Sequence, residues 1–383
     1  MPWKKVDAMT LKVDFVRLAL AGGLSMAQLC RRFEISRKTG YKWLERVRER
    51  GESGLQDRSR RPRGSPRQTA GELESKVEQL RREHPAWGPR TLHRVLANRG
   101  IEGLPSVSTV AAILRRRGLI NEVEAAKHKA FKRFEHKRPN DLWQMDFLGH
   151  FGIDSGRCHT LTALDDHSRF NVVLAACHNE RTETVRQRLI EAFRRYGLPL
   201  RMTMDNGSPW GNGSDRHDLT PLAVWLMRLN IGVSHSRPYH PQTQGKDERF
   251  HRTLRAEALA GRQFTDLLQV QSRLDQWREV YNGVRPHQGL AMDVPQSRYQ
   301  ASPRPYPEQL PALEYAPEDH VRKVQAMGWT HFNGRQFKLP KALRGQSVAL
   351  RATDSDGTYD VYFGPQKVST LDLRSHVVTQ SNV

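Results

Sequence analysis

The stretch LWQMDFLGHFGI, residues 142–153, is the point at which the sequence changes from helical to strand-like patterning. Apolar side chains alternate with others along it, which is the pattern of a β-strand. Residues 158–166 (CHTLTALDD) and 169–177 (RFNVVLAAC) are predicted as two further strands. A helix, a short buried strand, a second helix, a fifth strand and a third helix follow within residues 182–254. This order predicts a mixed α/β sheet of five strands.

Three acidic residues occupy special places in this sheet. Asp146 lies inside the first strand, where an acid without a partner is costly, Asp205 ends the fourth strand, and Glu248 begins the last helix. The first and fourth strands of such a sheet can be neighbours, which would bring Asp146 and Asp205 together. Three converging carboxylates repel one another unless a cation holds them, and oxygen ligands favour Mg²⁺ or Mn²⁺. Two such ions flanking a phosphodiester would activate the attacking oxygen and stabilise the leaving oxygen.

Each acid taken alone also has a simpler interpretation. Asp205 opens the sequence Asp-Asn-Gly, which favours a tight turn. Glu248 could form an i, i+4 salt bridge with Arg252. Asp165 and Asp166 are rival acids that fit a polar turn between strands. The ordered set of three acids, rather than any single member, favours the metal site.

Five motifs occur in order over residues 142–290: LWQMDF, ALDDHSRF, MDNGSPW, HPQTQGKDERFHRTL and YNGVRPHQGL. Together they resemble the integrase core of bacterial insertion-sequence transposases, which are relatives of retroviral integrases. The resemblance implies a ribonuclease-H-like fold and an Asp-Asp-Glu triad that binds two Mg²⁺ (or Mn²⁺) ions. By motif, the triad is Asp146, Asp205 and Glu248, the last being the glutamate of Gln-Gly-x-x-Glu.

Helical geometry places the adjacent acids Asp247 and Glu248 on different sides of their helix. At 100° per residue, Asp247 lies nearer the apolar side of the helix, which carries Phe250. Glu248 shares a face with Arg252 and Arg255, which are expected to meet DNA phosphates beside the metal ions.

The sequence departs from the retroviral pattern in two places. The interval between Asp205 and Glu248 is longer than is typical of retroviral integrases, and the polar segment WGNGSDRHDL at 210–219 accounts for the added length. No zinc module of paired His and Cys is present, so helix-turn-helix modules are expected to replace it.

The N-terminal part is predicted to be helical. Residues 9–50 read as three helices, with Ser25 and Ser36 as N-caps of the second and third. Two short helices joined by a tight turn indicate a helix-turn-helix, with an ordinary helical bundle as the alternative. Residues 71–120 predict a second such module, whose final helix starts near Ser108. The residues expected to contact DNA are Arg37, Lys38, Thr39, Lys42, Arg90, Arg115 and Arg116, while Ile35, Trp43 and Leu44 are expected in the core.

Linkers separate these parts. Residues 58–70 are a basic linker, and its RPRG at 61–64 resembles the core of an AT-hook, in which Arg61 and Arg63 would enter the minor groove. A plain basic linker fits this segment as well. A second basic connector, residues 121–140, leads to the sheet.

The C-terminal part is predicted to be a β-domain. A Pro-rich linker at 294–320 precedes alternating segments with turns at DSDG and FGP in residues 321–383. This pattern resembles the small C-terminal β-barrel of integrases, which helps hold DNA. A purely structural β-domain is the alternative.

Composition narrows the class of partner. The chain of 383 residues has a formal charge of +21, which argues for a polyanion and by default for nucleic acid, with a solvated basic surface as the alternative. Lys246, Arg252 and Arg255 are further candidates for DNA contacts. Three scattered cysteines form neither a disulfide framework nor a zinc cluster, which fits a reducing cytoplasm. No apolar stretch is long enough to span a bilayer.

These observations predict a multidomain protein with helix-turn-helix modules at 1–57 and 71–120, a catalytic core at 141–293 and a β-barrel at 321–383. The resemblance implies a bacterial, nucleoid-associated DNA transposase that works as a homo-oligomer. It would bind the terminal inverted repeats of its element, free a 3′ end and join it to target DNA. A stand-alone metal-dependent nuclease and a non-catalytic DNA-binding regulator derived from a transposase are the alternatives.

Overall fold

The computed structural model describes residues 7–57, 69–120, 135–205, 207–211, 219–235, 245–374 and 377–380. The chain divides into two compact units, residues 1–68 and 69–383. The segment with Arg61 and Arg63 and the central part of the insert between Asp205 and Glu248 lie outside the described residues. None of the helices in the described ranges is long and apolar enough to cross a membrane.

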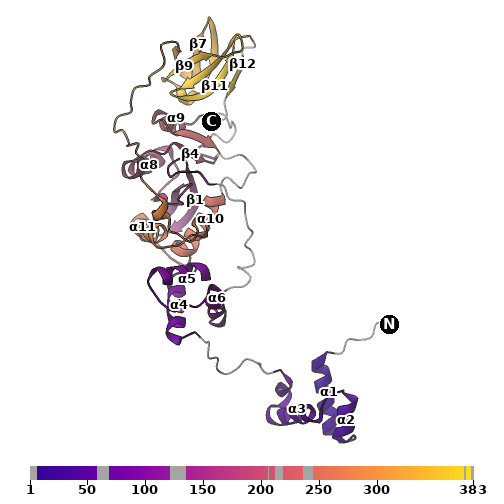
Figure 1. The fold of residues 1–383 in the computed structure, drawn as a ribbon. Coiled ribbons are helices and arrows are strands. Elements are labelled where there is room, and N and C mark those ends of the chain that lie inside the picture. Colours follow the sequence, from indigo (N-terminus) through magenta and orange to yellow (C-terminus); the bar gives the residue numbers. More distant parts are fainter. Residues whose placement is uncertain are drawn as a thin grey trace. The chain divides into compact units, whose positions relative to one another are not determined.

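Within residues 7–57 the first unit contains three α-helices, and the starts of the second and third follow from local sequence (Figure 1). The predicted N-caps are confirmed: Ser25 forms a capping box with Gln28, and the Ser36 hydroxyl accepts the Thr39 N–H at 3.1 Å. Such caps satisfy backbone donors that the first turn of a helix leaves without partners. The elements are α1 (Ala8–Ala21), α2 (Met26–Arg32), α3 (Arg37–Arg50) and the 3₁₀ turn η1 (Gly51–Leu55).

A close helix contact organises the core of this unit. A Cβ at Gly40 of α3 would lie 2.8 Å from both Cys30 Sγ and Phe15 Cζ, so a larger residue there would force these buried side chains to move. Trp43 and Leu44 are buried in the same core, as the sequence predicted. The exposed side of α3 is thereby left to its basic residues.

The second helical module has its own core, formed by Val77, Leu80, Trp87, Leu92 and the last helix. The N-cap of that helix is Ser106, whose hydroxyl accepts the Thr109 N–H at 3.3 Å, so the helix begins at Val107, one residue before the expected Ser108. The helices are α4 (Gly71–Glu83), α5 (Pro89–Asn98) and α6 (Val107–Arg116).

The central sheet has the strand order β3-β2-β1-β4-β5, which confirms the predicted five-stranded mixed sheet. β1, β2 and β3 pair antiparallel, whereas β1–β4 and β4–β5 pair parallel. The predicted neighbourhood of the first and fourth strands is therefore confirmed. The strands are β1 (Trp143–Ile153), β2 (Gly156–Asp165), β3 (Asn171–Cys177), β4 (Arg201–Met204) and β5 (Gly232–His235).

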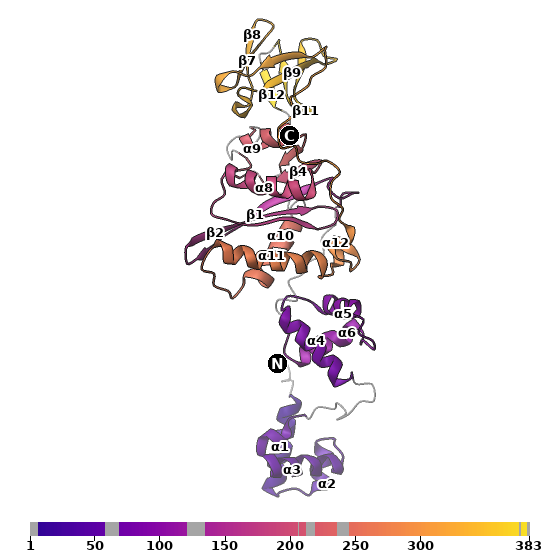
Figure 2. The same cartoon turned by 90° about the vertical axis from the view of Figure 1, so that its left-hand side faces the viewer.

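Helices cover both faces of this sheet, with α8 and α9 on one face and α10 and α11 on the other (Figure 2). Side chains that alternate along β1 explain this division. Trp143 and Met145 belong to the hydrophobic core formed with α8 and α9, whereas Leu148 belongs to the core formed with Phe250 and Leu254 of α10. The helical elements are α8 (Thr182–Tyr196), α9 (Pro221–Arg228), α10 (Gly245–Leu254), the π-helical turn η2 (Arg255–Leu259), α11 (Leu267–Gly283), η3 (Gln288–Leu290) and α12 (Pro295–Arg298).

Amide side chains from α11 cover the outer edge of β3. Gln271 accepts the Ala176 N–H at 2.8 Å and donates to the Leu174 carbonyl at 3.1 Å. Asn282 makes the same pair of bonds to the backbone of Asn171. These side chains bond to backbone groups of β3 that a neighbouring strand would otherwise use. They therefore protect this edge of the sheet from pairing with another chain.

The C-terminal strands form an antiparallel sheet in the order β12-β11-β10-β9-β6 and a separate hairpin of β7 and β8. Within the described residues no pairing joins the edge strands β6 and β12, so the expected closed barrel is not confirmed. The elements are β6 (His320–Lys323), η4 (Ala326–Gly328), β7 (Trp329–Phe332), β8 (Arg335–Lys338), η5 (Lys341–Leu343), β9 (Ser347–Ala352), β10 (Thr358–Phe363), β11 (Gln366–Asp372) and β12 (Val377–Gln380).

Candidate active site

Asp146 and Asp205 meet on neighbouring parallel strands. The register pairs Gln144 with Thr203, and two further steps bring Asp146 of β1 level with Asp205 after β4. Burial, and then the nearby Asp205 carboxylate, raise the pKa of Asp146 to about 6. Asp205 also makes the predicted turn, because its Oδ1 accepts the Gly207 N–H at 2.8 Å. The fold therefore places two mutually repelling carboxylates side by side, Asp146 within β1 and Asp205 directly after β4.

Helix α10 adds two side chains that the sequence analysis did not assign to the site. Asp247 is 3% exposed, and burial, followed by the charge of Asp146, raises its pKa to about 8. No hydrogen-bond donor among the described residues reaches Asp247 Oδ1. His251, one helical turn later, has its Nδ1 3.9 Å from Asp146 Oδ2. The i, i+4 spacing of these two residues was the only sequence signal for this shared face.

Hydrogen bonds indicate which ring nitrogen of His251 carries a hydrogen. The Thr162 hydroxyl donates to the Asp146 carbonyl at 2.9 Å, so His251 Nε2, 2.8 Å from that hydroxyl, must be the donor of their shared bond. Burial, and then the charge of Arg255, lower the pKa of His251 to about 4. The imidazole is therefore neutral at pH 7 and turns the lone pair of Nδ1 toward the Asp146 carboxylate.

Glu248 lies on an exposed side of α10 with Arg252 and Arg255, whereas Asp247 is buried with Phe250. No ion pair with Arg252 forms among the described residues, so the salt-bridge alternative is not supported. Across the described ranges, no three acidic, histidine or cysteine side chains are arranged to hold a metal ion. The structure brings Asp146 and Asp205 together and does not bring Glu248 to them.

The donor set around Asp146 nevertheless suits a divalent cation. Two carboxylates repel each other there, and the neutral His251 turns a lone pair toward Asp146. A bound cation would relieve this excess of negative charge and acceptors.

The rival acids Asp165 and Asp166 are structural. Asp165 accepts the backbone N–H of Asn140 and of Ser168, both at 2.7 Å, and the Ser168 hydroxyl at 2.5 Å. Burial raises the pKa of Asp165, and these hydrogen bonds oppose that rise. Asp166 accepts the His136 N–H at 2.8 Å and pairs with Lys246. The predicted polar turn is confirmed.

Most of the predicted DNA-contacting residues in the described ranges have exposed side chains: Arg37, Lys38, Lys42, Arg90, Arg115, Arg116, Arg252 and Arg255 are exposed, and Thr39 is half-buried. Arg116 is paired with the buried Glu74, and Arg255 donates to the Leu148 carbonyl at 2.7 Å. Lys246 departs from the expectation. Its ammonium is turned into the protein toward Asp166, because a buried carboxylate there needs a cation.

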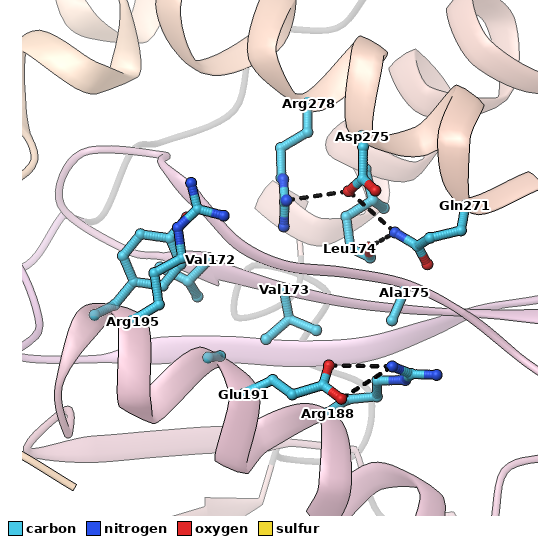
Figure 3. Close-up of a pocket in the computed structure, with 12 residues that line it drawn as sticks. Val172, Val173, Leu174, Ala175, Arg188, Glu191, Arg195, Gln271, Asp275 and Arg278 are labelled. Carbon is cyan, nitrogen blue, oxygen red and sulfur yellow. Dashed lines mark hydrogen bonds and ion pairs between the residues drawn. The ribbon is translucent and has the colours of Figure 1, made fainter. Parts of the chain in front are cut away.

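A cavity of about 270 Å³ lies between β3, α8 and α11, away from the predicted triad (Figure 3). Its acids are each paired with an arginine, Glu191 with Arg188 at 3.1 Å and Asp275 with Arg278 at 3.0 Å. None of the predicted catalytic residues lines this cavity. The acids on β1 and β4 therefore remain the candidate active site.

The fold and these acids define a protein with an integrase-type core and helix-turn-helix modules. Family models described as "Integrase core domain" match residues 136–241 and 229–295, and one described as "IS481 family transposase, C-terminal domain" matches residues 319–379. Models for a helix-turn-helix domain and a homeodomain-like domain match residues 11–63 and 39–114. These matches give the chain an integrase core domain and an insertion-sequence transposase C-terminal domain, and they support a bacterial insertion-sequence transposase with a core of the retroviral integrase type.

Parts of the chain are similar to individual proteins and to a solved structure. The chain is 26% identical over 61% of its length to an uncharacterised protein of insertion element IS476 from Xanthomonas euvesicatoria, of which it spans 65%, just under two thirds. It is 24% identical over 57% of its length to an uncharacterised protein of insertion element IS407 from Burkholderia multivorans, of which it spans 77%. A chain of the simian T-cell lymphotropic virus intasome is 14% identical, with a TM-score of 0.38 over 80% of this chain and 98% of that one.

Proposed function

We propose that the protein is a DNA transposase that binds the terminal inverted repeats of its element and catalyses 3′-end cleavage and strand transfer. The observation that carries this proposal is the juxtaposition of Asp146 and Asp205 on neighbouring parallel strands, beside the helix that carries Glu248. The matching family models support the reaction class, polynucleotidyl transfer.

Asp146, Asp205 and Glu248 would hold two Mg²⁺ or Mn²⁺ ions, which when bound activate an attacking oxygen and stabilise a leaving one. In cleavage, water attacks the phosphodiester at the element end and a 3′ hydroxyl leaves. In strand transfer, that hydroxyl attacks a target phosphodiester and a target 3′ hydroxyl leaves. No covalent enzyme intermediate is needed, because the oxygen nucleophile in each step is water or DNA.

The chain's own residues prepare this site. The His251–Thr162 pair holds the backbone of β1 at Asp146 through the bond from the Thr162 hydroxyl to its carbonyl. Because His251 is neutral, it adds no positive charge that would compete with a metal ion. Glu248 would complete the site when DNA and metal ions draw α10 and the adjoining chain toward β4.

DNA recognition would be divided between the helical modules and the core. Arg37, Lys38 and Lys42 on α3 are exposed and suited to a groove, and Arg90 and Arg115 present further charge in the second module. Arg252 on α10 would hold phosphate near the acids. Two element ends must be joined in one event, so we expect a homo-oligomer on DNA.

Paired substitutions on α10 test the proposal. Glu248→Gln removes the proposed third ligand and should abolish both cleavage and joining of a labelled duplex taken from the DNA that flanks the gene. Binding to that duplex should persist. Asp247→Asn is the matched control: it keeps the shape of a buried side chain and should change both reactions much less. Equal losses from the two substitutions would contradict the assignment of Glu248.

The exposed position of Glu248 favours a second candidate, a DNA-binding regulator without catalysis. A strand-transfer assay on the wild-type chain separates the candidates. Joined products support the transposase, cut but unjoined ends support a nuclease, and binding without either product supports the regulator.

A further inference from the structure

Charged residues are unevenly distributed along the C-terminal sheet domain. Residues 345–374 contain three basic residues and four aspartates, whereas residues 320–344 contain six basic residues and no Asp or Glu. All six have exposed side chains except Arg335, which is half-buried. The segment from β6 to η5 therefore carries most of the positive charge of this domain. Its basic residues are Arg322, Lys323, Arg335, Lys338, Lys341 and Arg344.

The two segments also differ in how their basic side chains are paired. Each basic side chain of residues 345–374 has a carboxylate oxygen 2.7 to 3.3 Å away, in the pairs Arg351–Asp319, Lys367–Asp360 and Arg374–Asp372. Within the described part of the chain, none of the six basic side chains of residues 320–344 forms an ion pair with a carboxylate. Their charge is therefore available to an anionic partner.

The hairpin of β7 and β8 presents an exposed aromatic side chain within this basic segment. Burial alternates along both strands, so one face of the hairpin joins the core and the other is exposed. The register places two pairs of residues directly opposite each other on the exposed face. This hairpin face consists of Trp329 opposite Lys338 and His331 opposite Gln336.

The backbone beneath the hairpin face is held in place. On its inner side Phe332 and Phe337 are buried in the core. Gly328 precedes Trp329 with φ +89°, and a Cβ there would lie 2.2 Å from the Leu339 carbonyl oxygen. The Leu339 N–H donates to the Gly328 carbonyl at 2.8 Å. The Trp329 indole is thus presented from a fixed backbone, which lowers the ordering cost of binding.

The surroundings of the indole leave it open to a planar partner. Trp329 is 37% exposed, and in the described ranges no other aromatic ring packs against it. Lys338 Nζ lies 6.0 Å from the ring centroid, at the outer limit of a cation–π contact, so it holds the ring weakly. An exposed ring beside unpaired cations suits single-stranded nucleic acid, because bases stack on the ring while cations follow the phosphates. Inside a duplex, each base is already stacked on its neighbours.

We propose that the hairpin face binds single-stranded DNA, with an unpaired base stacked on Trp329 and an adjacent phosphate held by Lys338. The unpaired positive charge around the indole favours this polyanion over an apolar protein surface. The inference goes beyond the proposed function, since it concerns unpaired DNA and requires neither Asp146 nor a metal ion. Its failure would therefore leave the proposed metal site untouched.

Binding of a short labelled oligothymidine to the full chain in a chelator tests the proposal, with fluorescence anisotropy as the measurement. Trp329→Leu keeps an apolar side chain but removes the ring, and should weaken binding about tenfold, within the range that one base–aromatic stack contributes. Trp329→Phe should retain most of the affinity. Lys338→Gln should reduce the slope of log affinity against log salt by about 0.7, the value for one phosphate of a single strand. Trp329→Leu should leave that slope unchanged.

A matched variant and a second probe separate this site from general attraction to DNA. Lys367→Gln removes a cation of the same domain that is already paired with Asp360, and should leave the oligothymidine affinity unchanged. A labelled duplex should bind Trp329→Leu as tightly as it binds the wild type. Equal losses on both probes would replace the single-strand site with a duplex surface. Wild-type oligothymidine affinity in Trp329→Leu, or an equal loss in Trp329→Phe, would overturn the stacking.

A measurement on the wild type keeps the proposal testable if Trp329→Leu does not fold. The oligothymidine then carries one fluorescent adenine analogue whose emission is quenched when it stacks on an aromatic ring. We expect quenching as the full chain saturates the probe, and much less quenching with Trp329→Phe, whose ring is smaller. Emission that stays constant or rises at saturation would overturn the inference.

Discussion

Two pairs of aspartates belong to the same central sheet: Asp165 and Asp166 at the end of β2, and Asp146 and Asp205 at β1 and β4. The protein surrounds the first pair with hydrogen-bond donors and the second pair with few. Asp165 and Asp166 receive backbone N–H groups, a hydroxyl, an amide and the Lys246 ammonium. Asp146 receives one N–H, from Phe147, and faces a second carboxylate. Only the first pair is satisfied by the fold itself.

This difference teaches how to tell a structural acid from a functional one. A carboxylate that holds loops together is surrounded by donors, because a buried acceptor without donors destabilises the fold. A carboxylate in a cation-binding site has few donors and lies near other carboxylates. Burial and those like charges raise its pKa, as they do for Asp146.

The largest effect should follow from neutralising a metal ligand. Asp146→Asn should reduce cleavage and strand transfer on the order of a thousandfold or more, because a preorganised charge at the reacting phosphate is lost. The same substitution should leave the metal-free protein equally or more resistant to heat, since a repulsive charge is removed. Product formation from labelled element ends and thermal unfolding in a chelator measure the two effects. A clear loss of metal-free stability would place Asp146 with the structural acids.

Removal of a structural acid should instead lower the stability of the fold. Asp165→Ala takes the acceptor from the buried N–H groups of Asn140 and Ser168, and should lower the free energy of unfolding by about 3 kcal/mol. Urea denaturation measures this loss, with Asp354→Ala, at an exposed position in the C-terminal sheet domain, as the control. An Asp165→Ala protein as stable as the control would break the comparison.

The two classes should also differ in their response to pH. The folded-state pKa of Asp146, about 6, lies above its ordinary value of 3.8. The unfolded chain therefore loses this proton first, so the stability that the group contributes is present below pH 4 and is lost as pH rises through about 6. The advantage of Asp146→Asn over the wild type in a chelator should grow across this window by on the order of 1–3 kcal/mol. Urea denaturation at several pH values should show the growth, and a constant difference would contradict it.

The smallest effect should come from an exposed cation beside the acids. Arg252→Ala should weaken binding to the element-end duplex a few-fold and reduce the slope of log affinity against log salt by about 1, because one phosphate contact is lost. Arg255→Ala should in addition destabilise the fold, because the Arg255 guanidinium donates to the Leu148 carbonyl at 2.7 Å. Equal salt slopes for wild type and Arg252→Ala would remove Arg252 from the DNA surface.

Local patterns in the sequence predicted much of the fold. Ser25 and Ser36 begin helices because a hydroxyl can satisfy N–H groups two or three residues ahead. The phase of α10 predicted that Asp247 lies toward Phe250 and that Glu248 shares a face with Arg252, since 100° per residue separates neighbours on a helix. The structure buries Asp247 and exposes Glu248. Such rules involve residues that are close in the chain, so no knowledge of packing is needed.

Long-range partners were not predicted. Lys246 looked like one more basic residue available for DNA, yet its partner Asp166 lies 80 positions earlier. His251 gave no sign that it would bond to Thr162, 89 positions away. The resemblance suggested a barrel, but pairing between β6 and β12 depends on how far each strand curves, which alternation does not specify.

The sequence by itself determined the order of helices and strands, the caps, the buried face of α10 and the family. Tertiary structure alone decided which acids are satisfied and which repel each other. The physical reason is that hydrogen bonds and charge interactions act over a few ångströms, so their partners are settled only when distant segments pack against one another.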